Sequence, residues 1–217
     1  MELNIRNANL NDIPFLVETI IEAEKSGTSI FSYSTIFGLS EDEAKQYISL
    51  MLEEEVDDCE LSVSAFLLAE SEGKSVGAVC AWIEGNDDIP SSTLKGNLLR
   101  YTLPSKCFES LSKLNNLIKE LHIDYIDKAI QIGLVYISKE ARGRGLVQQL
   151  LTEKTDELAN LNPHKKDVYV QVFGNNMPAI KAYEKVGFEI ISTKVAISPD
   201  IINYLPANSK VLMKLIK

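Results

Sequence analysis

Apolar and polar residues alternate along this chain with periods that change from strand-like to helix-like several times. Leu3 to Arg6 alternates at every residue, which predicts a short strand. Asn11-Asp12-Ile13-Pro14 then supplies a helix start with proline in the first turn, and we expect this helix to continue to about Lys25. Ser40-Glu41-Asp42-Glu43 has the composition of a capping box, which predicts a second helix through Glu54.

The middle of the chain predicts a hairpin and one further helix. Two extended runs, Ser62 to Ala69 and Ser75 to Trp82, are separated by the turn-forming sequence Ser71-Glu72-Gly73-Lys74, so we expect antiparallel neighbours. The tract from Asn86 to Tyr101 has no clear period and is predicted to be irregular. The apolar residues that follow fall on one face of a helix: Phe108, Leu111, Leu114, Leu117, Ile118 and Leu121.

The last third predicts strands and helices in alternation. The expected strands are Ala129 to Ile137, Val168 to Phe173, Phe188 to Ile197 and Val211 to Ile216, with helices ending at about Leu161 and spanning about Pro178 to Val186. The sequence contains no internal repeat or obvious linker. We therefore predict one mixed α/β domain over residues 1–217, with an inserted segment at about 86–128.

Composition narrows the class of protein. The 22 basic and 31 acidic residues give a net charge of -9, which argues against nucleic-acid binding and is compatible with a cationic small-molecule or peptide substrate. The three cysteines, Cys59, Cys80 and Cys107, form no CxxC pair, so neither disulfides nor a metal site is expected. The N-terminus does not resemble a secretion signal, and no run approaches the ~20 apolar residues of a membrane span. We expect a cytoplasmic protein without membrane contact.

Two glycines alternate with two arginines where a strand is predicted to pass into a helix, in the sequence EARGRGLVQQLL from Glu140 to Leu151. The first N–H groups of a helix lack internal partners and can bind an anion. Glycines at 143 and 145 would let a phosphate approach them without a Cβ in the way. The alternative is a tight surface turn with two solvated arginines. The sequence has no GxxxxGK[ST] motif, and this corner lacks the third glycine of a dinucleotide fingerprint.

A second motif lies about thirty residues further on, in VQVFGNNMPAIKAYEKVGFEII. Together the two segments resemble the GCN5-related N-acetyltransferase (GNAT) family, which binds acetyl-CoA. The first family motif, R/Q-x-x-G-x-G/A, resembles the run Arg142, Gly143, Arg144, Gly145, Leu146 and Val147. The second motif, N-x-x-A-x-x-x-Y followed by G-F, is similar to Asn176, Ala179, Tyr183, Gly187 and Phe188.

The resemblance implies a GNAT-like fold and a set of roles. It implies a mostly antiparallel sheet with one splayed strand pair, whose gap holds the pantetheine arm against the backbone of Val135, Tyr136 and Ile137. The pyrophosphate would lie on the amides of residues 142 to 147, and an N–H near Tyr136 or Ile137 would face the oxyanion. Tyr183 occupies the general-acid position. Asn176 would orient the cofactor or Tyr183, cap the following helix, or do both, and Ala179 belongs to the same cofactor motif.

The sequence departs from the family at one position, where Val147 replaces the usual glycine or alanine and would crowd the pyrophosphate. It also does not identify a general base. Gln131 and Gly133 lie where some relatives carry a catalytic glutamate. Other titratable residues near predicted strand ends or in loops are expected to be solvated or isolated: Glu84, Asp87, Asp127, His122 and His164.

Function and assembly are left with alternatives. The resemblance implies acetyl transfer from acetyl-CoA to a primary amine, without a metal. A CoA-binding sensor or scaffold without transferase activity is the alternative. The insert at 86–128 is expected to form a lid or wall of the acceptor site, or else to extend the core or support a homodimer.

Overall fold

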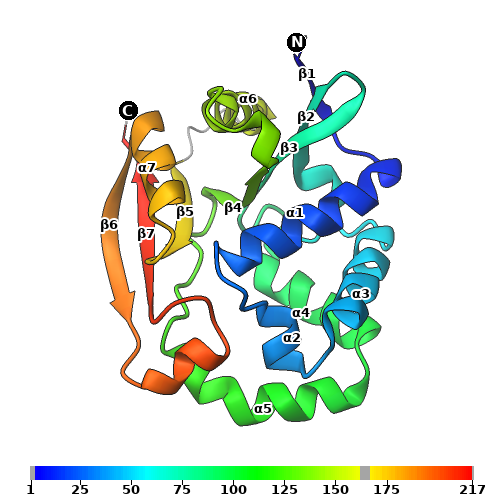
Figure 1. Ribbon diagram of the computed structural model, residues 1–217, viewed down its shortest axis with the longest axis vertical. Coiled ribbons are helices and arrows are strands. Elements are labelled where there is room, and N and C mark those ends of the chain that lie inside the picture. The colour runs from blue at the N-terminus through cyan, green and yellow to red at the C-terminus, as the bar shows by residue number, and fades with distance from the viewer. Residues whose placement is uncertain (1–2, 162–166, 217) are drawn as a thin grey trace.

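A seven-stranded sheet runs through the molecule in the computed structural model, which describes residues 3–161 and 167–216 (Figure 1). The strand order is β1-β2-β3-β4-β5-β7-β6. β4 and β5 are parallel, and the other neighbouring pairs are antiparallel. This confirms the expected α/β fold with a mostly antiparallel sheet. The strands are β1 (Leu3–Asn7), β2 (Phe66–Ser71), β3 (Lys74–Ile83), β4 (Ile130–Ile137), β5 (Val168–Phe173), β6 (Phe188–Val195) and β7 (Ser209–Leu215).

Helices cover both faces of the sheet, because successive strand residues point to opposite faces and both sets are apolar. Phe66 and Leu68 join one buried cluster, while Leu67 and Ala69 join another. The first cluster packs under α1 to α5, which we call the α1 face, and the second under α6 and α7, the α6 face. The helices are α1 (Ile13–Lys25), α2 (Ser32–Phe37), α3 (Glu41–Glu53), α4 (Ser91–Thr102), α5 (Ser105–Lys119), α6 (Leu146–Leu161) and α7 (Met177–Val186).

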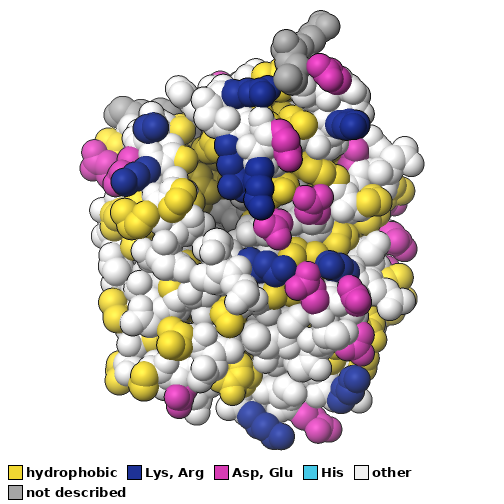
Figure 2. Space-filling view, in the orientation of Figure 1, with side chains coloured by type: hydrophobic (Ala, Val, Ile, Leu, Met, Phe, Trp, Pro, Cys, Tyr) yellow, Lys and Arg dark blue, Asp and Glu magenta, His cyan; other side chains and the backbone are white. Residues whose placement is uncertain are grey.

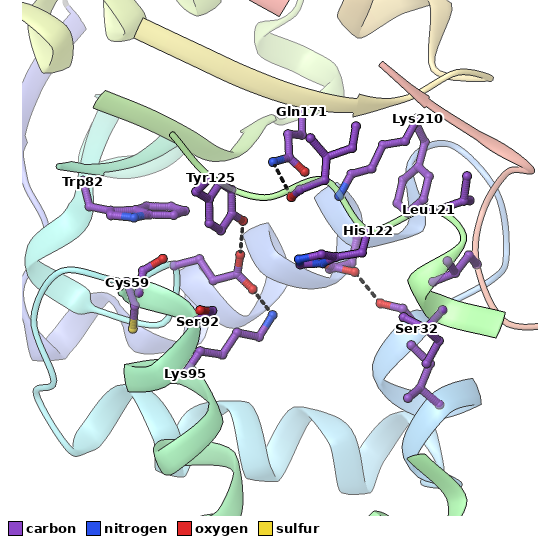
Figure 3. Close-up of a pocket in the computed structure, with 18 residues that line it drawn as sticks. Ser32, Cys59, Trp82, Ser92, Lys95, Leu121, His122, Tyr125, Gln171 and Lys210 are labelled. Atoms are coloured by element: carbon purple, nitrogen blue, oxygen red, sulfur yellow. Dashed lines mark hydrogen bonds and ion pairs between the residues drawn. The ribbon is translucent and has the colours of Figure 1, made fainter. Parts of the chain in front are cut away.

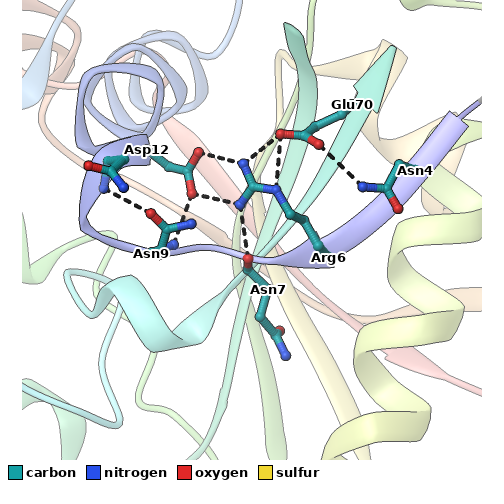
Figure 4. Close-up of polar contacts among 7 residues, drawn as sticks. Asn4, Arg6, Asn7, Asn9, Asp12 and Glu70 are labelled. Carbon is teal, nitrogen blue, oxygen red and sulfur yellow. Dashed lines mark hydrogen bonds and ion pairs between the residues drawn. The ribbon is translucent and has the colours of Figure 1, made fainter. Parts of the chain in front are cut away.

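Arg6 ties the first strand to the start of α1 and to β2 (Figure 4). Its guanidinium donates to both carboxylate oxygens of Asp12, at 2.7 and 2.8 Å, and its Nε donates to Glu70 at 3.0 Å. Hydrogen bonds from Arg6 lower the pKa of both carboxyl groups. Asp12 also accepts the backbone N–H of Asn9 at 2.9 Å, so one carboxylate both pairs with arginine and closes the turn before α1.

Local helix signals are confirmed where the sequence carries them. Ser40 and Glu43 form the expected capping box at the start of α3, and Pro14 lies in the first turn of α1. The prediction of an irregular tract at 86–101 is wrong, because α4 begins at Ser91. The backbone N–H of Ser91 is capped by Glu84, seven residues earlier at the end of β3, at 2.9 Å. No short-range cap was there to be recognised.

Two smaller differences concern segments next to the strands. Val63–Ala65 is a 3₁₀ turn, so the first strand of the hairpin begins at Phe66 and not at Ser62. The sequence pattern also gave no sign of α2, a six-residue helix of which Tyr33 and Phe37 are buried. A helix this short has too few turns to display a period.

The sheet opens between β4 and β5. These strands pair only from Ile130 with Val168 to Ile132 with Val170, although β4 continues to Ile137 and β5 to Phe173. The β3–β4 ladder shifts register between Val79 and Ala81, and such a bulge bends a strand pair. The expected splayed pair is therefore present, and its gap lies beyond Ile132.

Candidate active site

The edge of β4 presents main-chain groups to this gap. The N–H of Ser138 donates to the carbonyl of Val76 in β3, at 2.9 Å. Because antiparallel partners alternate along a ladder, Tyr136 also points its main chain to β3, whereas Val135 and Ile137 point theirs away from β3, toward the gap. The main-chain expectation for residues 135 to 137 is therefore corrected for Tyr136, whose N–H and C=O belong to the β3 ladder.

The corner between β4 and α6 is open and left-handed at both glycines. Gly143 and Gly145 each have φ of 76°, and no atom lies within 4 Å of a Cβ built on either. Residues 142 to 145 are exposed, and α6 starts at the next residue. Figure 2 shows basic side chains gathered over this corner, beside a hollow between α1 and α7. The corner therefore has the exposure, the backbone conformation and the charge of an anion site.

Two side chains at this corner contact neighbouring parts of the protein. The Nε of Arg142 donates to the carbonyl of Ile137 at 3.0 Å, which fixes the corner to the end of β4. Val147 is half-buried and packs against the cluster on the α6 face. Its branched side chain is thus partly accommodated by the core.

Asn176 caps α7 and also joins it to α1. Its side-chain oxygen accepts the N–H of Ala179 at 3.2 Å, and its Nδ2 donates to Ser26 Oγ at 2.9 Å. Ser26 is the C-terminal cap of α1, in the left-handed region. The capping role is therefore present, and both ends of the amide are used to hold the start of α7 against the end of α1.

Tyr183 lies in α7 with its ring buried on the α6 face. The ring packs edge-on to Phe188, with 5.7 Å between the centroids. Burial alone raises the pKa of the phenol, and within residues 3–161 and 167–216 no hydrogen-bond partner holds its hydroxyl. The group is therefore protonated at neutral pH and can donate its proton.

A cavity of about 280 Å³ lies on the α1 face (Figure 3). Its lining comes from α1, α2, the residues before β2, the inserted segment, β5 and β7. Gln171 and Phe173 of the lining follow Val170, the last β5 residue paired with β4. The cavity thus meets the sheet where β4 and β5 separate. Glu120, within the insert, joins it to the segment after β6 by accepting the N–H groups of Ile197 and Ser198 at 2.7 and 2.9 Å.

Two charged residues of the cavity lining form a direct ion pair. Lys95 pairs with Glu60, whose other oxygen accepts from Tyr125 at 3.4 Å. Burial disfavours the charge of each, but the partner's charge outweighs it: the pKa of Glu60 is lowered and that of Lys95 is raised well above its ordinary value. Lys95 also lies 5.5 Å from the ring centre of Tyr33.

Two further charged groups in the lining are not paired in this way. Glu24 of α1 accepts from Ser32 Oγ, and burial raises the pKa of its carboxyl group. Lys210 of β7 lies 5.7 Å from the ring centre of Phe173, and burial lowers the pKa of its ammonium group. The sequence reasoning missed both residues. A usable signal for Glu24 was its place four residues after Ile20 and eight after Leu16, on the buried stripe of α1.

The residues weighed as general bases are distributed differently from expectation. Glu84 is not solvated but buried, where it binds Trp82 Nε1 at 2.9 Å and Ser91. Asp87 and Asp127 are exposed, as expected. His122 is also exposed, but it lines the cavity and is not isolated. His164 lies outside the described residues.

Gly133 explains how the cavity wall is built without a glutamate on β4. A Cβ at this position would lie 2.5 Å from the ring of Trp82 and 3.6 Å from the Cβ of Glu60. The ring can take this place only because residue 133 has no side chain. Glu60 consequently brings a carboxylate to the neighbourhood from the segment before β2.

Comparison with known proteins gives the family. The sequence model of the acetyltransferase (GNAT) family matches residues 34–188, more than half of the chain. The chain belongs to the GNAT acetyltransferase family. Acetyltransferases of this family use acetyl-CoA as co-substrate and act on amines.

Solved GNAT structures share its fold at low sequence identity. An N-acetyltransferase from Staphylococcus aureus Mu50 is 19% identical, with a TM-score of 0.65 over 97% of this chain and 99% of that one. A polyamine N-acetyltransferase of Drosophila melanogaster, which forms N-acetylagmatine, is 12% identical, with a TM-score of 0.59 and full coverage of both chains. These likenesses concern the fold.

A curated relative matches over a shorter stretch. The mycothiol acetyltransferase of Corynebacterium jeikeium is 30% identical over 78 residues, which is 36% of this chain. The match covers only 22% of that protein's length. It supports the family and says nothing about the acceptor.

The part of the chain that the structure describes contains neither a candidate membrane span nor a candidate metal cluster. In residues 3–161 and 167–216, none of the helices has both the length and the apolar character that crossing a membrane requires. The same residues hold no group of three or more histidine, cysteine, aspartate or glutamate side chains placed to bind a metal.

Proposed function

We propose that this enzyme transfers the acetyl group of acetyl-CoA directly to a primary amine of a small molecule bound on the α1 face. The observation that carries the proposal is a charged cavity that meets the sheet at the opening between β4 and β5. Its volume of about 280 Å³ is at the lower end of the range for small-molecule sites, which favours a compact acceptor over a peptide.

The α6 face and the gap would hold the acyl donor. Main-chain groups of Val135 can pair with a pantetheine amide as an added strand would. The N–H groups from Gly143 to Val147, at the positive end of α6, suit the pyrophosphate, with Arg142 and Arg144 beside them. The N–H of Ile137 is our candidate for the oxyanion donor, because it faces the gap.

Two side chains would move the protons. Glu24, with its raised pKa, accepts a proton from the acceptor's ammonium group, which frees the nitrogen lone pair to attack the thioester carbon. The new C–N bond forms first, with the oxyanion facing the N–H of Ile137, and the C–S bond breaks as the oxyanion collapses. Tyr183 donates its phenolic proton to the departing thiolate, and the nitrogen then loses its second proton, which regenerates the phenol. Holding both reactants in one site can supply several kcal/mol of the rate acceleration, up to roughly 7–11 in intramolecular models.

The test measures CoA release and N-acetylated product over a panel of small amines, with agmatine as its doubly cationic member. Tyr183→Phe should lower kcat by about 10²–10⁴-fold, the usual contribution of a general acid, and leave the Kd of acetyl-CoA unchanged. Tyr169→Phe is the matched control, because it removes a buried phenol from the neighbouring strand, where the hydroxyl bonds Asp167. Equal turnover by wild type and Tyr183→Phe would remove the assigned role.

A further inference from the structure

We propose that the acceptor is an amine that also carries a carboxylate, held between Glu24 and Lys210. This rests on the proposed function, since it assigns the chemical class of the molecule that enters the same cavity. Glu24 receives the ammonium end, and Lys210 receives the carboxylate.

The charge inventory of the cavity leads to this assignment. Glu60 and Lys95 neutralise one another in direct contact. Glu24 has only a neutral hydroxyl as its hydrogen-bond donor, and Lys210 has no carboxylate in contact anywhere in residues 3–161 and 167–216. One negative and one positive charge that form no direct ion pair therefore line the same small cavity, and although each acts on the other through space, a zwitterionic amine complements both.

Lys210 has the position of a ligand-binding cation. Figure 3 shows Lys210 and Lys95 extending into the cavity from different walls. An ammonium group has three donors and no acceptor, and a half-buried one without a partner is unfavourable. The lowered pKa of Lys210 has this cause, and a bound carboxylate would satisfy the group.

Lys214 provides the internal comparison. It lies four residues along β7, so both lysines are on the α1 face of the sheet. Lys214 pairs with Asp167 at 2.8 Å, outside the cavity. The strand therefore carries one lysine that is used for structure and one whose anion is left to a ligand.

Glu24 defines the other end of the acceptor. It extends from the last turn of α1, whose C-terminal cap is bonded to Asn176 at the start of α7. A negative charge held there attracts the ammonium group and then takes its proton. A diamine would bring its second ammonium group toward Lys210 and Lys95, which disfavours it.

The remaining lining residues indicate the chemical character of the rest of the acceptor. Apolar side chains come from α2, from the insert and from the segment before β7: Ile36, Ile118, Leu121 and Leu205. These surfaces suit a short hydrocarbon portion between or beside the two charged groups. The acceptor class is thus a small amino acid, of the α type or with the amine further along the chain.

The experiment compares acceptors that differ only in the anion. Leucine is paired with isopentylamine, and 4-aminobutyrate is paired with butylamine and with putrescine, and kcat/KM is measured for each. We expect at least about a tenfold preference for the carboxylate member in one series, the value of a charge-assisted hydrogen bond. Lys210→Met should abolish that preference and leave the KM of acetyl-CoA unchanged.

Lys214→Met is the control and should retain the preference. Lys210→Gln keeps a polar side chain and guards against a folding defect in Lys210→Met. As a second measurement, pentanoate, which has the carboxylate but no amine, should compete with the acceptor in wild type and lose this effect in Lys210→Met.

The outcomes separate the two proposals. Acetylation of the plain amines as fast as the amino acids, or a preference that survives in Lys210→Met, overturns the acceptor assignment while the transferase stands. If kcat/KM is higher for the aminophosphonate analogue than for the amino acid, the assignment of a carboxylate to the acceptor is overturned. If no amine of either kind yields an N-acetylated product, it is the proposed small-amine function that fails.

Discussion

The proposed cofactor site on one face of the sheet and the cavity on the other are built from different parts of the chain. On the α6 face, the proposed cofactor groups come from two short stretches, residues 135–147 and 176–183, and many are main-chain atoms. On the α1 face, the cavity is lined by side chains from segments far apart in the sequence, among them Glu24, Glu60, Lys95 and Lys210. A diphosphate can be held by successive N–H groups of one corner, whereas a small organic acceptor needs walls on several sides. The predictions below separate effects on one face from effects on the other.

Glu24→Gln should produce the largest effect, and it should appear on the acceptor side alone. Without the carboxylate, kcat/KM at neutral pH should fall by about 10²–10⁴-fold, the usual contribution of a general base. The groups that face Glu24 are Ser32, Lys95, Glu60 and Lys210.

The pH dependence of activity tests the assignment of Glu24 as the base. Because the pKa of Glu24 is raised above the ordinary 4.5, wild-type activity should be lost at a higher pH than for a solvated glutamate as the solution is acidified. The variant should lack this step and recover at alkaline pH, where the amine loses its own proton. Glu22→Gln, exposed on the same helix, should behave like wild type. A variant with unchanged activity at neutral pH would exclude Glu24 as the base.

Gly145→Val tests the cofactor side. A branched side chain is strained at φ of 76° and would crowd the phosphate approach, so the KM of acetyl-CoA should rise by about 10–100-fold. The increase should be equal for all acceptors, because the α1 face is unchanged. Gly73→Val is the matched control: Gly73 has φ of 73°, equally open surroundings and a place in the β2–β3 turn. If both variants raise the KM alike, the corner has no special role.

Lys95→Met distinguishes the structural lysine of the cavity from the ligand-binding one. This substitution would leave the half-buried carboxylate of Glu60 without the ammonium group that pairs with it. We therefore expect the free energy of unfolding to fall by about 2–3 kcal/mol. Lys210→Met removes an ammonium group that no carboxylate contacts within the described residues, and it should change the free energy of unfolding by less than ~0.5 kcal/mol. Urea titrations of both variants, and of Lys95→Met with Glu60→Gln, measure this. Equal losses for the two lysines would contradict the distinction.

Arg6→Met should have the smallest effect and alter neither face. We expect a loss of about 1–2 kcal/mol in unfolding free energy at pH 7, since the network is partly exposed, with unchanged kinetics. Because the pKa values of Asp12 and Glu70 are lowered, their contribution exists above the ordinary carboxyl pKa and is lost as pH falls through the lowered values. The difference between variant and wild type should therefore shrink toward pH 2. A constant difference would rule out the linkage.

The accuracy of the sequence-based predictions follows the same division. Signals within a few residues, such as Ser40 with Glu43 or the glycines at 143 and 145, predicted elements that the structure contains. The α4 helix was missed because SSTLKGNLLRYT has Gly96 in its middle and takes its cap from Glu84 on another element. The start of α4 depends on the contact between Glu84 and Ser91, which forms only in the folded protein.

The candidate bases were misjudged for the same reason. Glu84 near a strand end resembled a solvated acid, yet the fold places it against Trp82 and Ser91. Glu24 was not among the candidates, although its spacing from Leu16 and Ile20 put it on the buried side of α1. Pairings between residues as distant as Lys95 and Glu60 have no local signal.

The missing side chain at Gly133 restricts how this enzyme could change by mutation. A glutamate there, as in some relatives, would displace the ring of Trp82, which packs edge-on to Tyr125 with 5.3 Å between the centroids. Tyr125 in turn bonds Glu60, so one substitution would disturb three residues of the cavity. A side chain at 133 therefore requires a smaller residue at 82, and the two positions depend on one another. Such mutual dependence makes the present arrangement difficult to change by single steps, and it predicts that positions 82 and 133 vary together among descendants of this sequence.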